Sequence, residues 1–193
     1  MAGHFQDFLD RLPSVLAGLS ADRQCAFGAA CCERHFPHYL RFVEQEHWGN
    51  SASLRATIDA AWKVIHGEQV TTSGFAASCE KAMPDTEDFT SKRSSFALNA
   101  AAMAAYLANF LETRRAKDIF WIASLGRDTA DVAAAEELWL PYTAITPEIE
   151  KGIEASSFMK DELEAQRDFL TIVQASELNI DRLILRARSV PCD

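Results

Sequence analysis

The sequence predicts an all-α fold, because its apolar residues recur at helical spacing and no stretch alternates with the period of two that a strand requires. With 48% hydrophobic and 24% charged residues, the composition is that of a globular protein rather than a disordered one. A chain of 193 residues can bury a core without metal ions or disulfides. We therefore expect one compact helical bundle over residues 1–193, with seven to eight helices.

Two helices are predicted in the amino-terminal third, and prolines bear on both. Pro13 fits the first turn of a short helix that ends near Leu19, and Ser20 is a suitable N-cap for the next helix. Because proline lacks a backbone donor and clashes with the preceding turn, Pro37 is expected to kink or restart this second helix. Its apolar face consists of Cys25, Ala29, Cys32 and Phe36.

Three helices are predicted in the middle of the chain. The first lies between Ser53 as N-cap and Gly67 as its stop, the second covers residues 91–115, and the third covers residues 118–139 before Pro141. Steps of three and four residues separate their apolar positions, which predicts one buried face on each helix. In the first two these positions are Leu54, Ile58, Trp62 and Ile65, then Phe96, Ala100, Met103, Leu107 and Phe110.

The C-terminal third carries the longest series, in which steps of four and three alternate strictly. A seven-residue repeat permits a coiled coil with another chain. We favour a long helix that packs on its own bundle, because two positions are polar and further apolar residues widen the stripe. Residues 176–179 are expected to break this helix in two. The series is Met159, Leu163, Gln166, Leu170, Val173, Glu177, Ile180, Ile184 and Ala187, widened by Phe169, Ile172 and Leu183.

Charge and composition exclude several classes of protein. The formal net charge of −9 argues against nucleic-acid binding, which needs an excess of Lys and Arg. No signal peptide is expected, and the most apolar stretch, residues 96–111, is shorter than the roughly 20 residues of a membrane span. The cysteines lack the spacing of a disulfide framework, so we expect reduced thiols and a cytoplasmic location. They are Cys25, Cys31, Cys32, Cys79 and Cys192.

No sequence motif predicts a cofactor or a metal site. Glycine-rich phosphate loops, dinucleotide fingerprints and paired Cys-x-x-Cys motifs are absent from the sequence. The nearest approach to a metal site is Cys31, His35 and His38, which would share one face of an unbroken helix. Because Pro37 interrupts that helix and no fourth ligand follows, we expect histidines beside core cysteines, with a redox-sensitive thiol as the alternative.

Two further groups of residues, one acidic and one bulky and apolar, are expected to have structural or surface roles. The carboxylates Asp161, Glu162 and Glu164 are expected on a solvent-facing helix surface rather than in an acid/base site. Bulky side chains near a predicted helix end are expected either to pack in the core or to form an exposed patch for self-association as a homodimer. These are Trp121, Trp139, Leu140 and Tyr142.

Several blocks of the sequence follow the order of motifs in a known family. One is the stretch Cys32-Glu33-Arg34-His35-Phe36-Pro37-His38-Tyr39, which is similar to a Cys-Glu-Arg-x-x-Pro-Asn-Tyr block. The later blocks are Trp48-Gly49, Leu54-Arg55 and residues 58–62, 83–89 and 95–101. In this order and spacing the chain resembles the YjaG-like proteins, a bacterial family of unknown function. The resemblance implies an all-helical, cytoplasmic, bacterial protein but no activity. His38 stands where the family has Asn, so no shared metal site is implied, and residues 188–193 depart from the family's tail.

Polar residues in or beside the predicted apolar faces are the candidate site: Cys32, Glu33, Arg34, Tyr39, Asp59, Trp62 and Asn99. Buried charges must be paired, so these groups form a structural network between helices, line a ligand or partner pocket, or catalyse a reaction. The first hypothesis is a non-catalytic interaction or adaptor protein. The alternative is a small-ligand-binding protein or enzyme with its site around Cys32, Glu33, Arg34 and Asp59. If these side chains line an open cavity, the ligand-binding protein or enzyme is favoured. If they pair with one another inside the core, the interaction protein is favoured.

Overall fold

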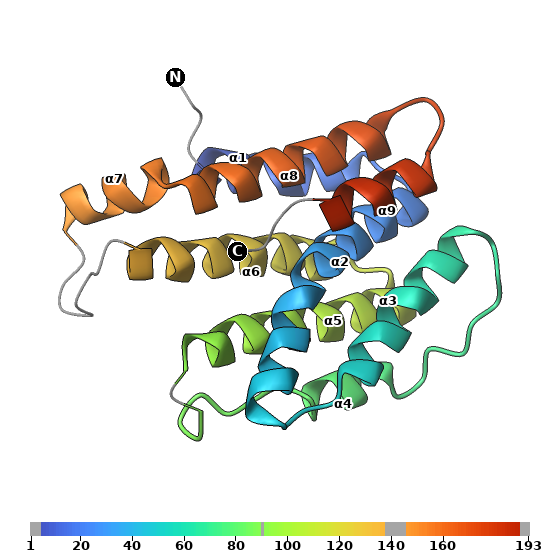
Figure 1. The fold of residues 1–193 in the computed structure, drawn as a ribbon. Helices are drawn as coiled ribbons and strands as arrows, with labels where there is room; N and C mark the ends of the chain where they lie inside the picture. The colour runs from blue at the N-terminus through green and yellow to red at the C-terminus, as the bar shows by residue number, and fades with distance from the viewer. Residues whose placement is uncertain (1–4, 90, 138–145, 190–193) are drawn as a thin grey trace.

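The computed structural model describes residues 5–89, 91–137 and 146–189, and within these ranges the only regular elements are helices, as Figure 1 shows. The all-α prediction is therefore confirmed. The described ranges hold nine helices, of which eight have seven or more residues. They are α1 (Phe5–Ala17), α2 (Ala21–Glu46), α3 (Ser51–Ile65), α4 (Phe75–Glu80), α5 (Lys92–Thr113), α6 (Ala116–Glu137), α7 (Pro147–Ala155), α8 (Ser157–Gln174) and α9 (Ile180–Ser189).

Helix α2 connects two groups of helices, which also meet where α5 packs against α6. On one side α3, α4 and α5 contact one another, and on the other α8 contacts α1, α6, α7 and α9. Helix α2 packs against α3 and α5 in the first group and against α6, α8 and α9 in the second, as its diagonal course in Figure 1 shows. Consecutive residues of α2 can therefore face different partner helices.

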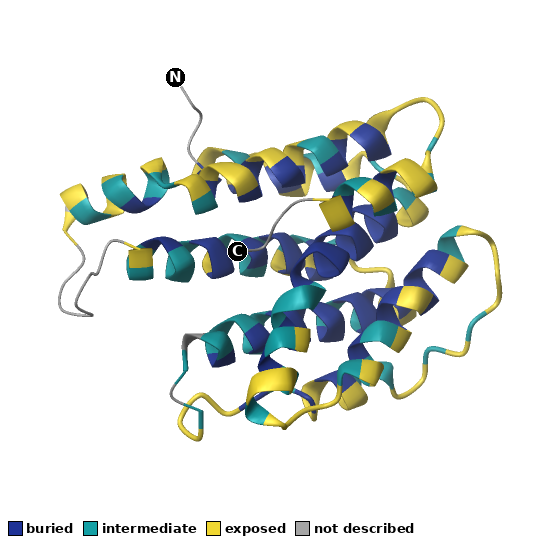
Figure 2. Ribbon diagram, in the orientation of Figure 1, coloured by how far each residue is buried: buried dark blue, intermediate teal, exposed yellow. Residues whose placement is uncertain are grey.

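The core fills the space between these helices in two clusters, and Figure 2 shows the buried faces turned inward. The larger cluster is built around Phe27, Phe110 and Phe169, and the smaller around Tyr39 and Phe42. Full burial of each large side chain stabilises the fold by about 1.5–3 kcal/mol. Short alanine side chains along α5 let α2, α3, α4 and α6 approach it closely.

Helix α2 continues through Pro37 to Glu46 as one element, so the expected restart does not occur. An interior proline leaves the carbonyl of the residue four positions earlier, Glu33, without its helical hydrogen bond, at a cost of about 3 kcal/mol. Tyr39 and Phe42, which follow the proline, are completely buried. Burial of these two side chains stabilises the continuous helix and offsets the local cost of the proline.

The other helix ends agree in part with the sequence predictions. Ser20 caps α2 by accepting a hydrogen bond from the backbone of Arg23, as predicted. Pro13 lies inside α1 rather than in its first turn, and Asn50 instead of Ser53 caps α3. In α1 the buried apolar positions already begin at Phe5, two turns before Pro13, and α3 begins at Ser51, three residues before its first buried apolar residue, Leu54.

The C-terminal helices pack on their own domain. Residues 175–179 separate α8 from α9, which confirms the predicted break. Phe169, Val173 and Leu183 of these helices are completely buried within the chain. The structure thus agrees with the arrangement that we favoured over a coiled coil with another chain.

Helix α5 is longer than the apolar stretch identified in the sequence. Among the described residues, its segment Arg93–Thr113 is the one helix with the length and mean hydropathy, 1.2, of a membrane span. The other helices bury 61% of its most apolar stretch. This burial is expected of the central helix of a helical domain, where neighbouring helices replace solvent.

Candidate functional site

The candidate site divides into two polar networks, because Glu33 and Arg34 are neighbours on α2. Adjacent residues of an α-helix project about 100° apart around its axis. Glu33 therefore reaches α3 and α9, while Arg34 reaches α8. We call these the Glu33 network (Glu33, Arg55, Asp59, Trp62 and Arg188) and the Glu162 network (Arg34, His35, Glu162 and Gln166).

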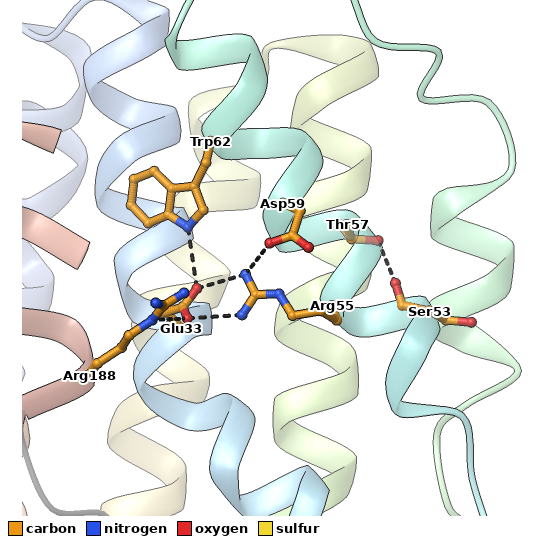
Figure 3. Close-up of polar contacts among 7 residues, drawn as sticks. All are labelled: Glu33, Ser53, Arg55, Thr57, Asp59, Trp62 and Arg188. Atoms are coloured by element: carbon orange, nitrogen blue, oxygen red, sulfur yellow. Dashed lines mark hydrogen bonds and ion pairs between the residues drawn. The ribbon is translucent and has the colours of Figure 1, made fainter. Parts of the chain in front are cut away.

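The Glu33 carboxylate accepts hydrogen bonds from three side chains, shown in Figure 3. The guanidinium of Arg55 donates to both oxygens, at 2.9 and 2.8 Å. Arg188 Nε donates to Oε1 at 2.7 Å, and the Trp62 indole donates to Oε2 at 3.3 Å. A carboxylate offers about four acceptor positions, so these bonds saturate it.

The charges within the Glu33 network balance. Arg55 also contacts the exposed Asp59 at 2.8 Å, so two arginines face two carboxylates. Burial by itself raises the pKa of Glu33, but the hydrogen bonds from Arg55 and Arg188 outweigh burial and lower that pKa. The carboxylate is thus ionised and occupied by groups of its own chain. The network joins α2 to α3 and α9.

The Glu162 network lies deeper in the protein, with each of its residues at most 5% exposed. Arg34 Nε donates to Glu162 Oε2 at 2.5 Å, and His35 Nε2 lies 3.2 Å from Oε1. Gln166 Nε2 donates to the same Oε1 at 2.8 Å and to the carbonyl of Ala123 at 3.0 Å. These contacts connect α2, α6 and α8.

The charge of Glu162 is stabilised in this buried position. Burial alone raises the pKa of the carboxyl, yet His35, Arg34 and the Gln166 amide together lower it well below its usual range. A buried pair of this kind contributes little net stability, but removal of one partner leaves an uncompensated charge. The network thus joins α2, α6 and α8 through contacts whose partners depend on one another.

Gly126 of α6 leaves space for the Glu162 network. A Cβ at this position would lie 2.6 Å from Glu162 Oε1, 2.9 Å from Gln166 Nε2 and 3.2 Å from His35 Nε2. Real Cβ atoms essentially never lie closer than 3.0 Å to another atom, so a side chain here must shift the ends of Glu162 and Gln166. The missing side chain at position 126 therefore leaves room for the network in its present geometry.

We expect Gly126→Ala to lower the free energy of unfolding by about 1–3 kcal/mol, because the added methyl group displaces the network. Helix propensity alone predicts the opposite sign, a gain of up to about 1 kcal/mol. Urea unfolding decides between the two signs. Gly18→Ala is the matched control, because its Cβ meets nothing closer than the Val15 carbonyl at 3.5 Å. A stabilised Gly126→Ala variant would show that the network is not tightly packed.

Acid is expected to destabilise the fold in two stages. Burial and the neighbouring His35 and Arg41 lower the pKa of His38 from 6.5 to about 3. The unfolded chain therefore binds the extra proton first, and stability falls as the pH drops below about 6.5. Below about 4.5, the lowered pKa values of Glu33 and Glu162 add a steeper loss. Urea midpoints measured against pH should show both stages, and His38→Gln should remove only the first.

The structure does not bring all the predicted site residues together. Glu33, Asp59 and Trp62 belong to one network and Arg34 to the other. Tyr39 donates to the Ala82 carbonyl at 2.6 Å, and Asn99 donates to the Thr129 hydroxyl at 3.1 Å between α5 and α6. Cys32 is buried, and burial raises the pKa of its thiol well above the usual value.

The residues that we considered as metal ligands, Cys31, His35 and His38, have different surroundings in the structure. Cys31 is completely buried, and the rings of His35 and His38 lie 5.7 Å apart. His38 packs against Phe96 at 5.1 Å, while His35 belongs to the Glu162 network. In the part of the chain that the structure describes, no three His, Cys, Asp or Glu side chains form a group that could hold a metal ion.

Sequence reasoning missed Arg55, Arg188, Gln166 and Gly126 as members or neighbours of the networks. It placed Glu162 on a solvent-facing surface, which is wrong, because this residue is 2% exposed. A signal was present in the spacing: Glu162 lies three residues after Met159 and four before Gln166, within the C-terminal apolar series. A carboxylate and an amide on a buried stripe indicate a paired network.

Trp121 is the one described member of the patch considered for self-association. It is 46% exposed, and its ring stacks on Tyr106 at 6.5 Å. Trp139, Leu140 and Tyr142 lie outside the described residues.

Comparison with known proteins agrees with the fold. A crystal structure of a DUF416 family protein from Shewanella baltica OS155, determined at 1.91 Å resolution, has a TM-score of 0.77 and 20% sequence identity. The match covers 91% of this chain and 90% of that chain, and it shows that the two share a fold. The comparison with curated proteins found no match. The family model "Protein of unknown function (DUF416)" matches residues 12–190, and this chain therefore belongs to the DUF416 family.

Proposed function

We propose that this protein is non-catalytic and acts through contacts between its surface and other proteins. The observation that carries this proposal is the state of its two buried carboxylates. Glu33 and Glu162 are each held by arginine and by further donors of the same chain. Groups that are fully engaged within the protein stabilise its helices and are poorly suited to bind a substrate.

The acid–base properties of these groups support the same proposal. A general acid or base works best with a pKa near the operating pH. The pKa values of Glu33 and Glu162 are both lowered, which keeps them ionised at neutral pH. Burial raises the pKa values of Cys31 and Cys32, so their thiols are poor nucleophiles. Of the polar residues that first suggested an enzyme, Cys32 and Glu33 thus have pKa values that are poorly suited to nucleophilic or acid–base catalysis.

A thermal-shift screen against a library of metabolites tests the proposal. A small ligand at about a hundred times its Kd stabilises a protein by about 2.7 kcal/mol, which raises the Tm by several degrees. We expect no metabolite to have this effect. A metabolite that stabilises the wild type and the Arg167→Ala control but not Arg55→Ala would contradict the proposal. Affinity capture from the native host, followed by reconstitution with the purified partner, provides the positive test.

A cytoplasmic location is part of the proposal. Four of the five cysteines lie in the described residues, and all four are buried free thiols: Cys25, Cys31, Cys32 and Cys79. Free thiols are typical of proteins in reducing compartments. Fractionation of the native host, with immunodetection of the chain, checks this expectation.

Self-association through the surface around Trp121 stays a prediction. Exposed aromatic side chains are enriched in protein interfaces. We expect sedimentation velocity to detect a dimer of the wild type, and Trp121→Ser to weaken it. Leu40→Ser serves as the control, because Leu40 is exposed to a similar extent, 42% against 46%. A wild type that stays monomeric at high concentration would refute this prediction.

A further inference from the structure

We propose that the groove between α8 and α9 docks an acidic segment of a partner protein that inserts an aliphatic side chain. This inference rests on the proposed function and names the chemistry of one partner surface. It is carried by the shape of the groove, by an exposed leucine in it and by the charge of α9.

The groove is a small open cavity of about 290 Å³. Ile172 of α8 and Leu185 of α9 supply its apolar lining. The polar lining consists of Asp168, Thr171, Arg182, Arg186 and Ser189. Pockets that hold drug-sized ligands have volumes of about 300–1,000 Å³. The groove is thus at the lower limit for a cofactor, and its size suits one or two side chains of a protein segment.

Leu185 is unusually exposed for a large apolar residue. Its exposed fraction is 70%, the highest among the exposed large hydrophobic side chains of the described chain. An isolated exposed leucine is common on protein surfaces. Here, however, it borders a cavity that already contains Ile172, so an inserted aliphatic side chain would cover both.

The positive charge of α9 beside the groove favours an acidic partner segment. Helix α9 carries Arg182, Arg186 and Arg188 against Asp181, within a chain whose formal net charge is −9. Asp168 holds Arg186 with contacts of 2.8 and 2.6 Å, and Glu33 holds Arg188. The Arg182 side chain forms no hydrogen bond or ion pair with a described residue. Its charge is therefore available to a carboxylate of the partner.

A second copy of the chain is a poorer occupant. A symmetric dimer through this groove would place the same helix α9 of both copies together. The net positive charge of α9, three arginines against Asp181, would then face itself across the interface, and like charges across an interface weaken binding. A heterologous partner with carboxylates around an aliphatic residue avoids this repulsion.

Fluorescence anisotropy with a matched pair of labelled helical peptides tests the charge requirement. One peptide has a central leucine flanked by glutamates at helical spacing, and the other has lysines in their place. We expect the acidic peptide to bind, and Arg182→Glu to weaken it about tenfold and to favour the basic peptide. Arg167→Glu makes the same charge change on the exposed surface of α8 and should have no effect. Equal binding of both peptides to the wild type would overturn the proposal.

A photo-cross-linking amino acid at position 185 tests the occupant in the native host. The expected product joins this position to an acidic segment of another protein, and Arg182→Glu abolishes it. Self-cross-links, lipid adducts or no product would each overturn the inference. A product formed from position 121 but not from 185 would show that the groove is not the docking site, and it would leave the proposed function intact. A stabilising metabolite that depends on Arg55 would instead contradict the proposed function.

Discussion

Replacement of Arg34 by alanine is expected to lower the free energy of unfolding by about 3–5 kcal/mol, which is one of the largest effects of any single change in this chain. Arg34 and Glu162 are 5% and 2% exposed, and their contact lies between α2 and α8. Without the guanidinium, the carboxylate stays buried with reduced compensation. For a domain of this size the loss corresponds to roughly 10 °C in Tm.

Thermal and urea unfolding measure this effect directly. Arg167→Ala on α8 is the control, because it removes the same charge from an exposed position and should change stability by no more than about 0.5 kcal/mol. An Arg34→Ala variant that melts within a few degrees of the wild type would mean that water reaches Glu162. In that case Arg34 would belong to an open pocket.

Glu162→Leu is expected to be destabilising to a similar extent, by about 3–5 kcal/mol. This change leaves the buried guanidinium of Arg34 without its carboxylate and removes an acceptor from Gln166. It also removes the lowered pKa that makes Glu162 sensitive to acid. The steep loss of stability below about pH 4.5 should therefore become shallower in this variant. If the pH dependence of the free energy of unfolding is unchanged in this variant, carboxylates other than Glu162 cause the loss of stability in acid.

Local sequence signals predicted much of the fold. The apolar series after Met159 identified the buried faces of α8 and α9, and Ser20 identified the start of α2. The restart that we considered at Pro37 does not occur, because distant helices bury Tyr39 and Phe42 on the far side of the proline. A proline penalty is a local quantity, whereas the packing that overcomes it is a tertiary one.

The candidate site was predictable only in part. Buried charge on α2 indicated that Glu33 and Arg34 need partners, but not which residues those partners are. Glu162 lies 128 residues from Arg34 in sequence, and Arg188 lies 155 residues from Glu33. A single sequence with many surface arginines and carboxylates does not distinguish these pairs from others. Only the packing of α8 and α9 on α2 selects them.

A double-mutant cycle between Arg34 and Glu162 tests the central claim that these polar residues form a closed structural network. The variants are Arg34→Met, Glu162→Leu and their combination, measured by urea unfolding. Apolar replacement of both members of a buried ion pair is often close to neutral. We therefore predict that the combination recovers most of the loss of each single variant, with a coupling of about 3 kcal/mol or more. Nearly neutral single variants with additive effects would contradict the claim and point to a solvated pocket.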